Sequence, residues 1–280
     1  KTAREIISYI KTNNFYKNQL SEIEEPKYSI EDLYGIIPTD TKTPWDIKEL
    51  IARIIDGSNF HEFKKLYGNT LVTGWAKIHN FPVGIIANNG IIFSESANKG
   101  AQFIQLCNHN NIPIIFLQNT TGFMVGKEYE QGGIIKNGAK LINAVANSGV
   151  PSITIMTGNS YGAGNYGMNG RSFNPRFLFS YPQSKLAVMG SDQIAGVMEI
   201  IKKNSAKSLD KKYDSKKQKI ERINLIESIE ESSSATFSSD NIWDDGILDP
   251  SETRNYLAFV LTVIYNSKIK GSKKYGVWRH

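Results

Sequence analysis

A run of glycine and other small residues at positions 157–168 constrains this chain more than any other segment. It follows residues 150–156, an apolar stretch of strand length, and it leads into residues that can form a helix. A strand that ends in such a turn leaves backbone N–H groups without partners at the start of a helix, where the helix dipole favours negative charge. The pattern therefore predicts a site in which backbone amides, rather than a side-chain nucleophile, stabilise an oxyanion.

A second unit of the same kind lies earlier in the chain. Residues 111–117 form an apolar run of strand length, residues 118–130 contain a glycine-bearing turn, and helical periodicity begins near Gly138. Two successive strand–turn–helix units predict an α/β fold with a layered sheet. In such folds, sites form at the ends of the strands.

Further elements follow from periodicity and from the placement of glycine, proline and charge. We expect helices at 2–13, 45–55, 94–110, 193–202 and 256–265, an extended linker at 22–46, strands at 70–78, 81–88, 176–182 and 185–190, and a charged helical insertion near 204–239.

The same glycines match other motifs in part. Residues 162–167 fit the dinucleotide pattern Gly-x-Gly-x-x-Gly without a clear acidic residue at the required distance, and residues 126–128 lack the Ser or Thr of a phosphate-binding loop. Residues 158–162 fit Gly-x-Ser-x-Gly, the nucleophile elbow, which makes a serine hydrolase built on Ser160 the alternative mechanism. Its acid and histidine partners are not evident, apart from His280. A plainer alternative is that these glycines only permit tight turns.

Composition limits the remaining classes of function. The formal net charge of +6 comes from local runs at 202–219 and 268–279, which lack a nucleic-acid motif and read as a solvated helix and a tail. No apolar run approaches a membrane span. Cys107 is the only cysteine, and the four histidines show no metal-ligand spacing with it or with each other. The sequence thus predicts neither a nucleic-acid nor a membrane partner, and no metal.

Three segments together, residues 118–130, 161–168 and 243–250, resemble the carboxyltransferase subunits of biotin-dependent acyl-CoA carboxylases. The resemblance is strongest to the β chain of methylcrotonoyl-CoA carboxylases and runs over nearly all 280 residues. It implies a crotonase-like spiral of repeated ββα units, which spacing alone would describe only as α/β.

The resemblance covers only the second, biotin-side domain of such a subunit. It implies that residues 1–45 are a connecting segment from a missing N-terminal acyl-CoA domain. Residues 46–280 would then be the C-terminal carboxyltransferase domain, including the charged insertion.

Site residues are carried over by position. The backbone N–H groups of the oxyanion hole would hold the ureido oxygen of biotin, and glycines without a Cβ would let biotin approach closely. The resemblance implies catalytic amides at Ala163 and Gly164, biotin contacts at Gly162, Ala163, Gly164, Gly122 and Phe123, and an acyl-substrate pocket at Asn165 and Tyr166.

The implied reaction moves a carboxyl group from carboxybiotin to 3-methylcrotonyl-CoA in leucine degradation. Alternatives are another acyl-CoA, such as geranyl-CoA or propionyl-CoA, or a non-catalytic assembly module of such a complex. The implied partners are the acyl-CoA substrate, a biotinylated α subunit that carries the cofactor, and further β subunits in a homo-oligomer. Because the family's active site lies between two subunits, we expect this chain alone to be inactive. Its expected location is the mitochondrial matrix in a eukaryote and the cytoplasm otherwise.

Overall fold

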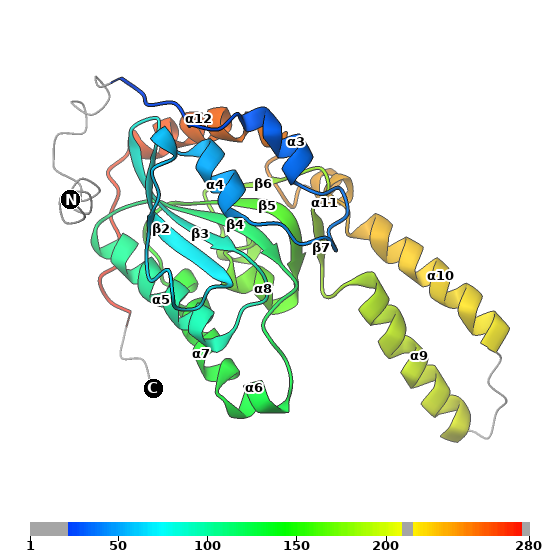
Figure 1. Ribbon diagram of the computed structural model, residues 1–280. Helices are drawn as coiled ribbons and strands as arrows, with labels where there is room; N and C mark the ends of the chain where they lie inside the picture. Colours follow the sequence, from blue (N-terminus) through cyan, green and yellow to red (C-terminus); the bar gives the residue numbers. More distant parts are fainter. Residues whose placement is uncertain (1–21, 209–214, 276–280) are drawn as a thin grey trace.

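The computed structural model describes residues 22–208 and 215–275, so the helix expected at 2–13 lies outside the described residues (Figure 1). Seven strands form one sheet in the order β1-β2-β3-β4-β5-β6, with β7 beside β5. Their bounds are β1 His61–Glu62, β2 Leu71–Ile78, β3 Phe81–Asn88, β4 Ile114–Thr120, β5 Ser152–Tyr161, β6 Phe177–Ser180 and β7 Lys185–Ala187.

The sheet changes from antiparallel to parallel along its width. Strands β1, β2 and β3 pair antiparallel, whereas β3 to β6 are parallel and β7 runs parallel to β5. Every residue of β3 is buried, as expected for a strand covered on both faces. The predicted α/β class is confirmed, and the parallel arrangement brings the ends of β4 and β5 to the same edge.

Helices cover both faces of the sheet. On one face, α5 (Ser94–His109) packs against α7 (Ile134–Ala146), and on the other α4 (Lys48–Ile54) contacts α12 (Thr253–Tyr265) (Figure 1). The shorter helices are α6 Lys127–Gln131, α8 Gly162–Gly167 and α11 Ala235–Asp240, with 3-10 turns η2 Asp56–Ser58, η3 Arg171–Phe173 and η4 Pro250–Glu252.

Strand β5 is longer than its apolar run suggests. The turn was expected to begin at position 157, but β5 continues to Tyr161. Its pairing with β4 shifts register between Gln118 and Thr120, and the Asn119 side chain bridges the irregularity, because Asn119 Oδ1 accepts from Asn159 N at 3.1 Å. A side chain from the neighbouring strand therefore extends β5 through residues that locally favour a turn.

The segment at 22–46 is not an extended linker throughout. It contains η1 (Ile30–Asp32) and α3 (Leu33–Ile36), and Leu33 is fully buried. Arg53, itself buried, donates to the Ser29 carbonyl at 3.0 Å and pairs with Asp32 at 3.2 Å. The extended prediction is therefore wrong for residues 30–36, because a side chain from α4 anchors them to the body.

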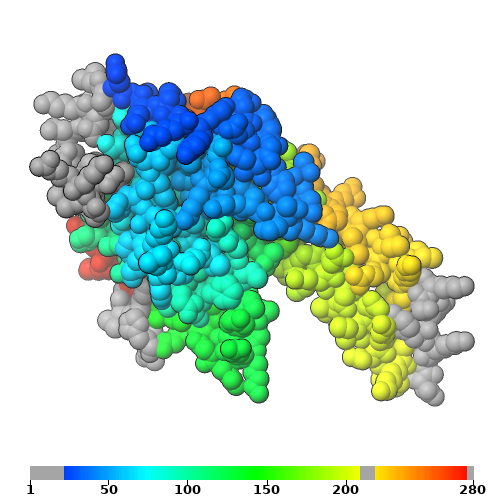
Figure 2. All heavy atoms as spheres, viewed as in Figure 1, coloured from blue at the N-terminus to red at the C-terminus, as the bar shows by residue number. Residues whose placement is uncertain are grey.

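Two long helices form an arm that stands away from the body. The helix expected at 193–202 runs as α9 (Ser191–Ser208), and α10 (Ser215–Ser232) lies alongside it (Figures 1 and 2). The ion pairs between them are half-buried, Lys202–Glu221 at 2.5 Å and Arg222–Glu199 at 3.3 Å. The helical character expected near 204–239 is confirmed where the chain is described. None of the helices in the described ranges has the length and apolar content to cross a membrane.

Candidate active site

The two glycine-bearing turns predicted from the sequence meet at one edge of the sheet. Gly122 follows β4 and Gly162 follows β5, and these strands are parallel neighbours. The backbone at Gly164 comes so close to the first turn that a Cβ there would lie 2.9 Å from Gly122 Cα. The structure thus brings Gly122, Gly162, Ala163 and Gly164 together.

The conformation of α8 requires glycine at two positions. Gly162 has φ +52°, in the left-handed region, and a Cβ there would also lie 2.8 Å from the Val188 carbonyl oxygen. A Cβ on Gly164 would lie 2.8 Å from Thr120 Cγ2. The first-turn N–H groups, those of Ala163 and Gly164 among them, have no carbonyl partner within the helix. This turn therefore presents the donors that an oxyanion site needs.

A cavity of about 350 Å³ lies beside Ala163. Its walls are residues 123–125, Glu130, one face of α7 between residues 134 and 142, and Ala163, and this set is called the Ala163 cavity below. The lining is apolar apart from Glu130, an exposed side chain. Ala163 is also exposed, so the cavity opens directly onto the first turn of α8.

Phe123 forms a fixed wall of this cavity. Its loop pairs with Ile92, because Ile92 N donates to Gly122 O at 3.0 Å and Met124 N donates to Ile92 O at 2.9 Å. The Phe123 ring packs against Gly138 of α7 and Gly167 of α8, each of which would place a Cβ 3.0 Å from the ring. The glycines make room for an aromatic ring in contact with both helices.

Asn165 and Tyr166 do not line the Ala163 cavity. The Asn165 side chain turns into the body and donates to Ser160 Oγ at 2.8 Å. Tyr166 is 46% exposed, and its ring meets Phe173 edge-on with centroids 5.8 Å apart. Their assignment to an acyl-substrate pocket stays a prediction.

The side-chain chemistry near the turn does not favour a hydrolase. Ser160 is fully buried, and its hydroxyl donates to Gln118 Oε1 at 2.6 Å while accepting from Asn165. Burial, with a smaller effect of the Glu230 carboxylate, raises the pKa of Tyr161 to about 12, so this phenol is neutral near pH 7. Within residues 22–208 and 215–275, no cluster of three His, Cys, Asp or Glu could hold a metal.

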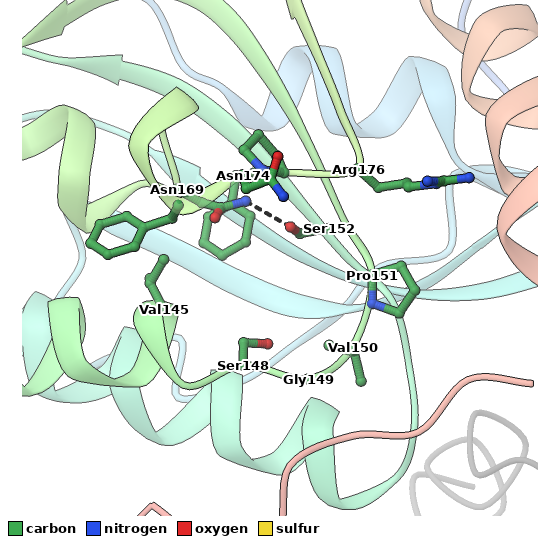
Figure 3. Close-up of a pocket in the computed structure, with 12 residues that line it drawn as sticks. Val145, Ser148, Gly149, Val150, Pro151, Ser152, Asn169, Asn174 and Arg176 are labelled. Atoms are coloured by element: carbon green, nitrogen blue, oxygen red, sulfur yellow. Dashed lines mark hydrogen bonds between the residues drawn. The ribbon is translucent and has the colours of Figure 1, made fainter.

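A second cavity, of about 320 Å³, lies at the opposite end of β5 (Figure 3). It is called the Ser152 cavity, and its walls are residues 148–152, residues 173–176, Asn169, Phe116 and Val145. Two of its polar side chains pair with each other, because Asn169 Nδ2 donates to Ser152 Oγ at 2.8 Å. None of the site residues predicted from the sequence lines this cavity.

The α7 face of the Ala163 cavity was missed by sequence reasoning. The helix was expected to begin near Gly138, but it begins at Ile134, after Gly133 in the left-handed conformation. The available signal was the isoleucine pair that follows two glycines: Ile134 is buried whereas Ile135 is 72% exposed at the cavity. An exposed isoleucine next to a buried one is typical of a helix that carries a second apolar face.

Comparison with known proteins gives a consistent result. Residues 1–277 match the family description "Carboxyl transferase domain". The mitochondrial methylcrotonoyl-CoA carboxylase β chain of Dictyostelium discoideum is 48% identical over 277 residues, which is 99% of this chain and 47% of that protein. A probable biotin-dependent acyl-coenzyme A carboxylase β2 subunit of Mycobacterium tuberculosis is 48% identical over 92% of this chain and 49% of its own length. The chain thus spans about half the length of these curated relatives.

Solved structures agree with the sequence relatives. The β subunit of P. aeruginosa geranyl-CoA carboxylase superposes with a TM-score of 0.82 at 38% identity, covering 99% of this chain and 52% of that one. Transcarboxylase 12S superposes with a TM-score of 0.81 at 27% identity, over 99% of this chain and 53% of that one. These neighbours confirm the crotonase-like fold class. The chain belongs to the carboxyl transferase domain family, with the β subunits of biotin-dependent acyl-CoA carboxylases.

Proposed function

We propose that this chain is the biotin-side part of a carboxyltransferase that moves a carboxyl group from carboxybiotin to 3-methylcrotonyl-CoA, a step of leucine degradation. The names of relatives at 44–48% identity support this substrate, since several are methylcrotonoyl-CoA carboxylase β chains. The mitochondrial names of the eukaryotic relatives support the mitochondrial matrix as the location in a eukaryotic source, with the cytoplasm otherwise.

The residues at the Ala163 cavity fit biotin. An apolar cavity of about 350 Å³ suits a small, largely apolar ring, and the adjacent first turn of α8 suits its polar ureido edge. Bound carboxybiotin supplies the carboxyl group, and negative charge develops on its ureido oxygen as that group leaves. The Ala163 and Gly164 N–H groups would donate to this oxygen, and Gly122 and Phe123 would hold the ring in place. The single observation that carries the proposal is this junction of an apolar cavity with the first turn of α8, whose N–H groups have no carbonyl partner within the helix.

The apolar lining contributes in a second way. It excludes water, and hydrogen bonds from aimed backbone donors are stronger where water is excluded. Loss of one such donor typically lowers kcat by about 10²–10³-fold. Glu130 is the only titratable residue among the described lining and is exposed, so we assign no side-chain base in this chain.

The rim of the cavity suits a second protein surface. Val125, Ile135 and Val188 are 75%, 72% and 77% exposed, and exposed apolar side chains that gather in one place are typical of interaction surfaces. Val125 and Ile135 line the cavity, and the Val188 carbonyl meets Gly162. We infer that an acyl-CoA domain of another β subunit covers this rim, and that a biotinylated α subunit delivers the cofactor. The hexamer assembly named for transcarboxylase 12S supports an oligomer.

A second candidate substrate has specific support. The superposed structure at TM-score 0.82 is named as a geranyl-CoA carboxylase β subunit. Competition between 3-methylcrotonyl-CoA and geranyl-CoA in one reaction mixture decides between them, because the ratio of kcat/KM values sets which product accumulates. Of the two predicted substrate-pocket residues, the exposed Tyr166 is the position to exchange if both are used.

Replacement of Ala163 by proline tests the proposal. In the full-length subunit with its biotinylated partner, Ala163→Pro removes one N–H donor and should lower kcat by about 10²–10³-fold. The matched variant Ala163→Gly removes the methyl group but keeps the N–H, and should retain activity within about threefold of wild type, because the donor is unchanged. Undiminished activity of a folded Ala163→Pro protein would contradict the assignment of this N–H as a catalytic donor.

A further inference from the structure

Helix α8 cannot be stable by itself. It has six residues, Gly162–Gly167, and three of them are glycine. Isolated helices shorter than about 12 residues are marginal in water, and each glycine lowers helix stability further. The position of its first-turn amides must therefore be set by contacts with the rest of the fold.

One path of hydrogen bonds holds this helix at its middle and at its C-terminal end. Asn165 Nδ2, in the middle of α8, donates to Ser160 Oγ at 2.8 Å, and Ser160 Oγ donates to Gln118 Oε1 at 2.6 Å. Gln118 Nε2 then donates to the carbonyl of Met168, the C-cap of α8, at 2.5 Å. This path of hydrogen bonds therefore starts at Asn165 in α8 and ends at Met168 of the same helix.

The path of hydrogen bonds runs through β4 and β5, the two strands that end at the site. Gln118 lies in β4 and Ser160 in β5, and both side chains are fully buried. Thr157 Oγ1 adds a hydrogen bond to the Gln118 carbonyl at 3.0 Å. Each hydroxyl and amide group in this path has a defined direction of donation, so the loss of one member leaves its neighbours unpaired in a buried place.

We propose that Gln118, Ser160 and Asn165 are positioning residues that fix α8 and thereby aim the Ala163 and Gly164 N–H groups. This inference rests on the proposed function and adds the residues that set its geometry. It also gives a role to the Gly-x-Ser-x-Gly pattern at 158–162, in which Ser160 is the middle link of a clamp. Asn165 acts through the hydrogen bond from its side chain to Ser160, and not as a wall of the Ala163 cavity.

The test uses Ser160→Ala and Asn165→Ala in the full-length subunit assembled with its biotinylated partner. Thr73→Val is the matched control, because Thr73 in β2 is equally buried and its hydroxyl donates to the Phe63 carbonyl, away from α8. A displacement of donors by about 1 Å can lower a rate about 10²-fold. We expect kcat to fall by about 10- to 100-fold in both clamp variants, with KM for the biotin carrier within about threefold of wild type and no fall in kcat for Thr73→Val.

Hydrogen exchange separates this inference from the proposed function. Amides of residues 162–168 should exchange at least about tenfold faster in Ser160→Ala than in Thr73→Val, because the local opening becomes more favourable. Hydrogen exchange needs no turnover. It therefore still tests whether these hydrogen bonds hold α8 if the wild-type enzyme transfers no carboxyl group and the proposed function fails. Unchanged exchange at 162–168 would overturn the clamp, as would a kcat within about twofold of wild type in Asn165→Ala, the variant at the less buried end of the path of hydrogen bonds.

Discussion

The two ends of strand β5 carry cavities of similar size but opposite chemistry. The Ala163 cavity, of about 350 Å³, has a largely apolar lining and adjoins the first turn of α8, whose N–H groups have no carbonyl partner within the helix. The Ser152 cavity, of about 320 Å³, has a mixed lining in which Asn169 donates to Ser152 (Figure 3), and Ser148 Oγ accepts from Asn108, outside the lining, at 2.8 Å.

This difference shows that volume alone does not mark a site. In the Ser152 cavity, Ser148, Ser152 and Asn169 already form hydrogen bonds within the fold, and Thr154 Oγ1 also donates to the Asn169 carbonyl at 2.8 Å. At the Ala163 end, the proposed function uses the first-turn amides of α8 as donors to a ligand, and the exposed Val125 and Ile135 line the adjacent cavity. Similar substitutions at the two cavities should therefore have similar effects on stability, whereas only those at the Ala163 cavity should strongly lower kcat.

The largest difference is expected for glycine substitutions. Gly164→Ala puts a Cβ 2.8 Å from Thr120 Cγ2 and should displace α8, lowering kcat by roughly 100-fold. Gly149→Ala is crowded to the same degree, 2.8 Å from the backbone nitrogen of Ser272, but at the Ser152 cavity. It should cost about 1–3 kcal/mol of stability and leave kcat nearly unchanged. Steady-state kinetics with denaturant unfolding of both variants checks this, and equal losses of kcat would remove the distinction between the ends.

Truncation of the aromatic wall should have a smaller effect. Phe123→Ala removes the ring that packs on Gly138 and Gly167, so we expect kcat/KM for the biotin carrier to fall about tenfold. The half-buried ring also stabilises the fold, and its loss should cost about 2 kcal/mol. Kinetics at varied carrier concentration measures the first effect and urea unfolding the second. Phe123→Leu keeps an apolar wall and should lose less; a wild-type kcat/KM in Phe123→Ala would mean that biotin does not use this wall.

An exposed side chain provides a subtler comparison. Ile135→Asp places a charge at the mouth of the Ala163 cavity, where Ile135 is 72% exposed, and should lower carboxyl transfer several-fold with little change in stability, because most surface substitutions cost under about 0.5 kcal/mol. Leu66→Asp is the control, since Leu66 is 93% exposed and does not line the cavity. Carboxyl-transfer assays of both variants under identical conditions test this difference. Equal activities of the two variants would show that Ile135 has no role at the site.

The smallest effect concerns the last residue of β5. Burial, and to a lesser degree Glu230, raises the pKa of Tyr161 to about 12. The folded state therefore keeps this proton longer than the unfolded chain, so the stability that it contributes is complete below about pH 10 and is lost as pH rises toward 12. Tyr161→Phe should leave the pH–rate profile unchanged between about pH 6 and 9 and should flatten the loss of stability above about pH 10. A shift of the neutral-pH profile would show that the phenol takes part in the reaction.

Local sequence patterns predicted the elements that local chemistry determines. The strands on either side of His79 and Asn80 were predicted from the turn between them, and both residues have positive φ, as a tight hairpin requires. The glycines at 122, 162 and 164 were predicted to form tight turns, and the structure brings these turns together. Their meeting follows from parallel strands that end at one edge.

The predictions from the sequence were wrong where side chains distant in the chain determine the backbone conformation. The extension of β5 depends on Asn119, a residue of the neighbouring strand β4, and the helices at 30–36 depend on Arg53, which contacts Ser29 and Asp32. The α7 wall of the Ala163 cavity depends on where that helix starts. No local window contains these partners, so propensity could not reveal them.

The most direct test of the account is a structure of the full-length subunit with biotin bound. We predict that the ureido oxygen lies within about 3 Å of the backbone nitrogens of Ala163 and Gly164. The ring should then lie in the Ala163 cavity against Phe123. Biotin held in the Ser152 cavity, or a ureido oxygen bound only by side chains away from α8, would contradict the account.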